Sequence, residues 1–82
     1  MTGIVKLVNN DKKLLAAQTG HGDYVILRLV NPVDTVDIGD KLEGELTMMG
    51  EQSIFNITKA QRVRMEIEET YLTLDTAQMV LS

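Results

Sequence analysis

Apolar and polar residues alternate along much of the chain, which is the pattern of β-strands that bury one face. The segment 62–68 shows it most clearly, because Val63, Met65 and Ile67 lie on one side and charged residues on the other. The segment 24–30 is apolar on both sides. Together with the turn-forming residues between segments, the pattern predicts six strands, at 3–8, 13–19, 24–30, 41–48, 53–58 and 62–68.

The residues between these segments predict turns and one longer loop. Residues 20–23 read Gly-His-Gly-Asp and form a tight turn, and residues 49–52 form a hairpin turn. Residues 33–40 form a loop after a proline that ends the third strand. Gly44 interrupts the apolar side of its segment, where a glycine marks a bulge or a sharp bend.

The tail of the chain has a different pattern. Asp75 followed three residues later by Gln78 resembles a capping box, in which the first side chain accepts a backbone N–H at a helix start. This predicts a short C-terminal helix. We divide the chain into a barrel domain over 1–70 and a tail over 71–82.

Six short strands separated by turns predict an all-β fold, either a sandwich or a barrel. A chain of 82 residues has room for one domain. Closing the sheet on itself removes the exposed strand edges that invite aggregation. We therefore predict a small antiparallel barrel of five to six strands with a short C-terminal helix.

Composition excludes several classes of function. The chain has no cysteine, which excludes disulfides, thiol nucleophiles and Cys-ligated metal sites, and its one histidine, His21, lies in a turn. We find no catalytic constellation and predict neither enzymatic activity nor a cofactor. No apolar stretch approaches the roughly 20 residues that span a bilayer. Since the first residues carry no signal-peptide pattern, we expect a cytoplasmic protein that makes no membrane contact.

Three carboxylates, Asp34, Asp37 and Asp40, occur close together in the loop 33–40. Calcium takes clustered carboxylates, but this spacing lacks the run of aspartates and the closing glutamate of a calcium loop. We interpret the segment as a solvated loop and predict no metal site.

Five short motifs follow one another in order between residues 3 and 58. They are GIVKLVN at 3–9, DKK at 11–13, GDYVIL at 22–27, LEG at 42–44 and IFNIT at 54–58. In this order they resemble the cold-shock domain family, whose first strand reads G-x-V-K-W-F-N. The resemblance implies an OB-fold barrel that binds single-stranded nucleic acid.

The chain departs from this family at the aromatic positions on which bases stack. All of these positions are aliphatic here: Leu7, Val8, Leu14, Ala16, Val25 and Leu27. Each stacked base contributes about 1–3 kcal/mol, so their loss removes most of the usual affinity. The matching residues that remain are Lys6, Asn9 and Lys12, which are able to contact phosphate but not to stack.

Charge is unevenly distributed along the chain. A net charge of −4 argues against nonspecific nucleic-acid binding, which depends on neutralising phosphates. Residues 1–31, however, carry four basic and two acidic side chains, whereas residues 32–82 carry four basic and ten acidic ones. We therefore predict weak binding of single-stranded DNA or RNA through a mildly basic face. The predicted contact residues are Lys6, Asn9, Lys12, Lys13, Tyr24 and Arg28.

The third strand supports a second hypothesis. A strand that is apolar on both faces is buried on both, so the outer face of this one needs a cover. The cover is either the tail, through Leu72, Leu74, Met79 and Leu81, or a second chain. The alternative function is thus an acidic protein-interaction module that has lost nucleic-acid binding, either a homo-oligomer or a subunit of a larger complex. Its predicted contact residues are Leu7, Leu14, Val25 and Leu27.

Overall fold

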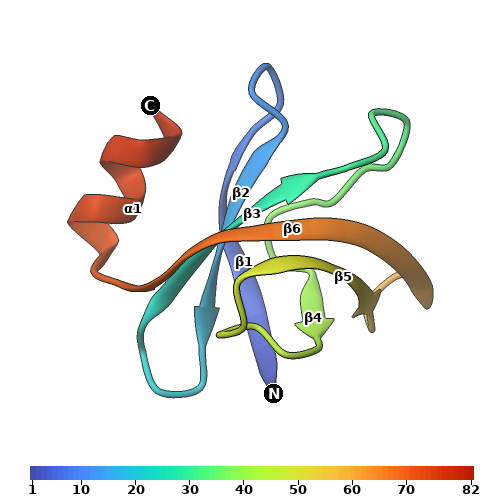
Figure 1. Ribbon diagram of the computed structural model, residues 1–82, viewed down its shortest axis with the longest axis horizontal. Helices are drawn as coiled ribbons and strands as arrows, with labels where there is room; N and C mark the ends of the chain where they lie inside the picture. Colours follow the sequence, from blue (N-terminus) through green and yellow to red (C-terminus); the bar gives the residue numbers. More distant parts are fainter.

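Six strands close into a barrel, and one short helix follows them (Figure 1). The computed structural model describes all 82 residues. Its elements are β1 (Thr2–Asn9), β2 (Leu14–Thr19), β3 (Tyr24–Leu29), β4 (Lys41–Glu43), β5 (Gly50–Asn56), β6 (Gln61–Leu72) and α1 (Leu74–Leu81). The predicted small all-β antiparallel barrel and the short C-terminal helix are confirmed.

The strands follow the order β1-β2-β3-β6-β5-β4, and β4 pairs with β1 to close the barrel. β6 is the longest strand, with 12 residues, and it pairs with β3 on one side and β5 on the other. In Figure 1 it crosses nearly the whole molecule and ends beside α1. All pairings are antiparallel, and the arrangement is consistent with an OB-like barrel.

The prediction of one strand over 41–48 is wrong in length, because β4 ends at Glu43. The chain bends at Gly44, where a Cβ atom would lie 2.7 Å from Cδ1 of the buried Ile54. The predicted bend at this glycine is therefore confirmed. The apolar alternation continues past the end of the strand because Leu46, in the following turn, also reaches the core.

The turn between β4 and β5 is held by one side chain. The amide of Gln52 donates to the carbonyl oxygens of Glu45 (2.7 Å) and Met48 (3.0 Å). β5 then begins at Gly50, so the hairpin turn predicted at 49–52 lies earlier in the chain. Met48, which the alternation places on the buried side, is exposed because it belongs to this turn.

The C-terminal helix begins two residues earlier than the capping box predicts. Its N-cap is Thr73, whose side-chain oxygen accepts the backbone N–H of Thr76 at 3.3 Å. Asp75 lies in the first turn, where a carboxylate also interacts favourably with the helix dipole. The chain contains no helix that is both long enough and apolar enough to cross a membrane.

Apolar side chains form two clusters, one on each side of the sheet. The inner cluster fills the barrel with 12 residues, namely Val5, Leu15, Ala17, Val25, Leu27, Val36, Leu42, Leu46, Ile54, Val63, Met65 and Ile67. The outer cluster lies between the sheet and α1 and consists of Leu14, Ala16, Tyr24, Ile26, Ala77 and Leu81. Each strand residue points to the opposite side from its neighbours, so β2 and β3 contribute to both clusters.

One buried polar group ties the loop before β4 to the β5–β6 turn. The carboxylate of Asp40 accepts hydrogen bonds from the Asp37 backbone N–H (3.0 Å) and the Asn56 side-chain amide (2.8 Å). The Lys59 ammonium lies 3.3 Å from Asp40 and 2.7 Å from Asp37. The two carboxylates predicted to be solvated are thus bridged by a lysine.

These contacts set the charge state of Asp40. Burial alone would raise the pKa of its carboxyl, but the Asp37 N–H, the Asn56 amide and the Lys59 ammonium together lower it below the usual value. The hydrogen bond to Asp37 and the proximity of Asp40 raise the pKa of Lys59 despite the opposing effect of burial. Both side chains are therefore charged in the folded state at neutral pH.

We expect Asp40→Asn to lower the free energy of unfolding at pH 7 by about 2–3 kcal/mol, since hydrogen bonds to a charged acceptor are lost. A carboxyl whose folded pKa lies below its unfolded value of about 3.9 stabilises the fold above that pH. This stabilisation is lost as the pH falls through the folded pKa. Urea unfolding between pH 7 and pH 2 should show the difference between the two proteins shrinking below about pH 4. A difference that stays constant with pH would contradict this assignment, and Asp34→Asn in the same loop is the control.

Candidate functional site

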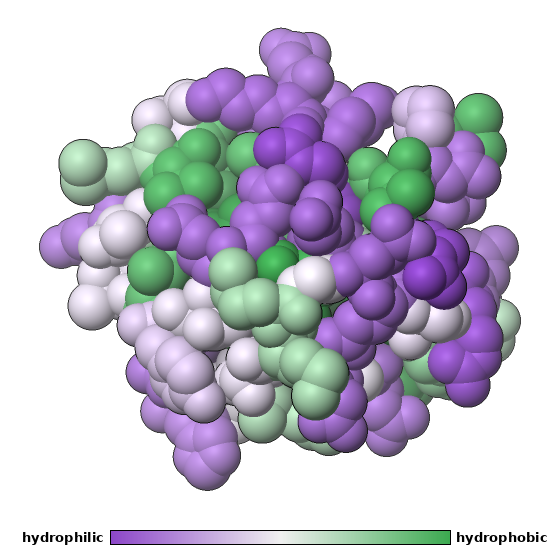
Figure 2. All heavy atoms as spheres, viewed as in Figure 1, coloured by the Kyte–Doolittle hydropathy of each residue, from purple (hydrophilic) through white to green (hydrophobic).

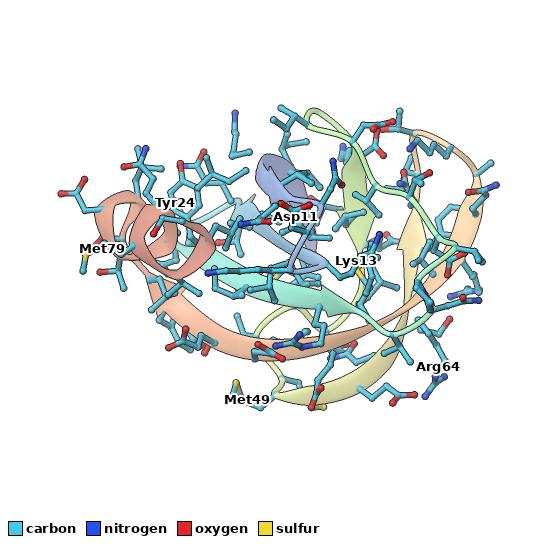
Figure 3. The ribbon with its side chains drawn as sticks, turned by 90° about the horizontal axis from the view of Figure 1, so that it is seen from above. Asp11, Lys13, Tyr24, Met49, Arg64 and Met79 are labelled. Atoms are coloured by element: carbon cyan, nitrogen blue, oxygen red, sulfur yellow. The ribbon has the colours of Figure 1, made fainter.

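The outer face of β1, β2 and β3 carries most of the candidate residues. Cross-strand pairing aligns Leu7 with Ala16 and Ala16 with Ile26 in one outward-facing row. Helix α1 covers this face, and Figure 3 shows the side chain of Tyr24 beside the helix. Of the two covers that the third strand allows, the tail of the chain itself is the one found.

One side of α1 provides the cover. Ala77 and Leu81, one helical turn apart, are buried, and Leu72 packs against the edge of the outer cluster. Leu74 and Met79 were also predicted to cover the strand, but 42% and 76% of their surface is exposed. Figure 3 shows Met79 on the side of α1 that faces away from the barrel.

The C-terminal end of α1 is fastened by two side chains from the β1–β2 hairpin. The amide of Asn9 donates to the Leu81 carbonyl oxygen at 2.6 Å, and the Lys12 ammonium donates to the Ser82 carbonyl oxygen at 2.5 Å. The Asn9 side-chain oxygen also accepts the Lys12 backbone N–H at 3.1 Å. Carbonyls at a helix end lack partners within the helix, and a cation beside them is favourable. The last turn of α1 has no basic residue of its own, so Lys12 takes that place.

Two of the predicted protein-contact residues are inaccessible. Val25 and Leu27 lie opposite Ala17 and Leu15 in the sheet, point into the barrel and have no exposed surface. Their assignment as contact residues is wrong, because the outward positions of β3 are the even-numbered ones. Leu14 faces outward but is buried beneath α1, and Leu7 is half-buried at the edge of the outer cluster.

The predicted nucleic-acid residues do not form one surface. Tyr24 is 7% exposed in the outer cluster. The Arg28 guanidinium donates two hydrogen bonds to the Glu68 carboxylate, at 2.5 and 3.2 Å, and these bonds raise the pKa of Arg28. With Asn9 and Lys12 bound to the end of α1, four of the six residues make contacts within the chain.

Lys6 and Lys13 are the two predicted basic residues whose side chains make neither an ion pair nor a hydrogen bond within the chain. Lys6 is exposed in β1 at the point where the pairing with β2 shifts by one residue. Lys13 lies in the β1–β2 hairpin with a positive φ of 57°, on the side of the hairpin away from α1 (Figure 3). Their ammonium groups are therefore the two in the predicted set that are not engaged within the chain.

A groove lies over β1, between the end of α1 and the loop before β4. It consists of two adjoining hollows of about 240 and 260 Å³ that share Val8 and Ile38. The first hollow is also lined by Leu7, Gln78, Leu81 and Ser82, and the second by Asn10, Val36 and Asp37. We call these two hollows the β1 groove.

The loop wall of the β1 groove is fixed by backbone hydrogen bonds to β1. The Gly39 N–H donates to the Val5 carbonyl at 2.8 Å, and the Val5 N–H donates to the Asp40 carbonyl at 2.9 Å. Gly39 has a φ of +95°, which favours glycine and turns the chain there. Ile38 is consequently held at the rim with 66% of its surface exposed.

Sequence reasoning missed this groove. In the sequence, Ile38 belongs to a segment predicted to be a solvated loop, and Val8 stands at a position where cold-shock domains have an aromatic ring. The one signal available was a large apolar residue directly before a loop glycine.

No family model matches the chain, and no curated protein or solved structure matches it either.

We expect Asn9→Ala to destabilise the attachment of α1, because the Leu81 carbonyl and the Lys12 N–H both lose a partner. The free energy of unfolding should fall by about 1–2 kcal/mol. Asn10→Ala is the matched control, since Asn10 is the exposed neighbour. Urea unfolding, with amide exchange of α1 followed by NMR, makes the comparison. Equal effects of the two substitutions would show that Asn9 does not hold the helix.

Proposed function

We propose that this protein is a protein-interaction module whose β1 groove accepts an apolar side chain of a partner polypeptide. The observation that carries the proposal is the exposed Ile38 held over the floor formed by Leu7 and Val8. Concave sites with apolar linings and a few polar groups at their edges are the usual form of binding sites. Here the polar groups come from Gln78 and Ser82 in the first hollow and from Asn10 and Asp37 in the second.

The loop that carries Ile38 has further exposed apolar residues. Val33 is 78% exposed and Val30, where the loop begins, is 44% exposed. Figure 2 shows the opposite side of the molecule, where β5 and β6 lie in front and apolar atoms reach the surface in small separate patches between polar ones. Single exposed apolar residues such as Val30 and Val33 favour a short partner segment that inserts one side chain, rather than a partner with a wide flat interface.

The net charge and the position of α1 also support a polypeptide partner. The face on which an oligonucleotide would need stacking residues is covered by α1. The basic side chains Lys12 and Arg28 make contacts within the chain, and the protein carries a net charge of −4. Neutralising phosphates would require free cations in greater number.

The test uses short peptides with a central leucine, methionine or phenylalanine, and the same peptide with a central serine. Amide shifts of the ¹⁵N-labelled protein at Leu7, Val8 and Ile38 should follow the apolar peptides and not the serine peptide. Ile38→Asp should weaken this binding about tenfold or more, since the apolar rim is replaced by a second carboxylate beside Asp37. Val33→Asp, on the same loop outside the groove, should leave it unchanged. Shifts that are absent, or equal for the serine peptide, would refute the proposal.

A second candidate is cold-shock-like binding of single-stranded nucleic acid. It is favoured by Lys6 and Lys13, which lie on the first hairpin without ion-pair partners, and by the order of motifs shared with that family. The same titration with oligothymidylate and oligouridylate at low salt separates the two. Shifts at these lysines, lost when both are changed to glutamate, would support nucleic acid as the ligand.

A further inference from the structure

The barrel core is complete without the C-terminal helix. None of the 12 residues of the inner cluster belongs to α1, and the six strands close on themselves by backbone pairing. The helix contributes Ala77 and Leu81 to the outer cluster only. Removing α1 therefore exposes the outer face of β1–β3 but opens no part of the barrel.

The attachment of α1 is also limited in extent. Beyond the outer cluster, the helix is held by hydrogen bonds from Asn9 and Lys12 at its C-terminal end. An isolated helix of eight residues is unstable in water, so α1 depends on its packing against the outer face of β1–β3. The outer face of β1–β3 needs the helix as a cover, and the helix needs this face in order to be stable. The two need not belong to the same chain.

β6 has a strained backbone at Tyr71, one residue before the strand ends and two before the N-cap of α1. Tyr71 has a φ of +58°, a left-handed conformation that bulky side chains rarely adopt, and 68% of its surface is exposed. It lies where β6 gains a residue relative to β3, since Ile26 pairs with Glu69 but Tyr24 pairs with Leu72. A change of Tyr71 to an extended conformation would redirect the chain from Leu72 onward, and α1 with it.

We infer that two copies of this chain exchange their C-terminal helices, so that each α1 occupies the outer face of β1–β3 of the other copy. Every contact of the helix re-forms with identical residues, and the segment at Tyr71 is free to adopt an extended conformation. Exchange of an identical element between copies has a low energetic cost for this reason. The partner is a second copy because the side chains of α1 already match this face.

The absence of cysteine from the chain allows a direct test. Ala16 and Ala77 are both fully buried in the outer cluster, one on the sheet and one on the helix. An Ala16→Cys protein and an Ala77→Cys protein are mixed, unfolded, refolded together at millimolar concentration and oxidised. A disulfide between the two proteins, identified by mass, shows exchange when its yield exceeds that of a mixture in which Ser53→Cys, exposed on β5, replaces Ala16→Cys.

The role of Tyr71 is tested in the same assay. Glycine adopts a positive φ without strain, so Tyr71→Gly removes the strain that favours exchange over packing within one chain. The yield of the mixed disulfide should then fall at least about fivefold. Ala60→Gly is the matched control, because Ala60 has a φ of +55° in the β5–β6 turn, away from α1. It should leave the yield unchanged.

Two results would overturn the inference. One is the absence of the mixed disulfide at millimolar concentration, while a protein carrying both cysteines forms the bond within one chain. The other is an equal effect of Tyr71→Gly and Ala60→Gly. Neither result bears on peptide binding in the β1 groove, which is measured on the unmodified chain at low concentration.

Discussion

The register of β2 and β3 is the constraint on which the rest of the structure depends. Both strands are apolar on both faces, and their pairing sends alternate side chains to opposite sides of one sheet. The inward set completes the barrel core. The outward set, with Ala16 and Ile26 at its centre, needs a cover that the barrel does not provide. A shift by one residue would exchange the two sets and leave both clusters mispacked.

Helix α1 meets this need and, in doing so, changes what the surface is able to bind. It buries Tyr24 and brings Asn9 and Lys12 to its own C-terminal end. Residues that resemble phosphate contacts thereby become structural ones. The same placement of α1 creates the β1 groove, since Leu81 forms one wall and Ile38 the other. The covering of β1–β3 by α1 and the β1 groove are therefore two consequences of one packing arrangement.

The sequence predicted what local patterns determine. β1, β2 and β3 lie within one or two residues of their predicted bounds, because short apolar runs ended by polar turn residues are local signals. The end of β4 was not predictable from the sequence. Leu46 lies in the turn after the strand, but it is buried in the core and so continues the apolar alternation of β4. The helix start was missed because Thr73 and Asp75 are both good capping residues, and the choice depends on where β6 ends. The groove was missed because Ile38 gains its position from hydrogen bonds between distant segments.

The central claim is that the closed barrel is stable on its own and that α1 is a separately attached element. Native-state hydrogen exchange tests it most directly, by measuring the free energy of opening for each amide at increasing low concentrations of denaturant. Our account predicts that the amides of α1 open with a lower free energy than those of β1, β2, β3 and β6, which should share the value for global unfolding. A single common free energy for helix and strands would contradict it.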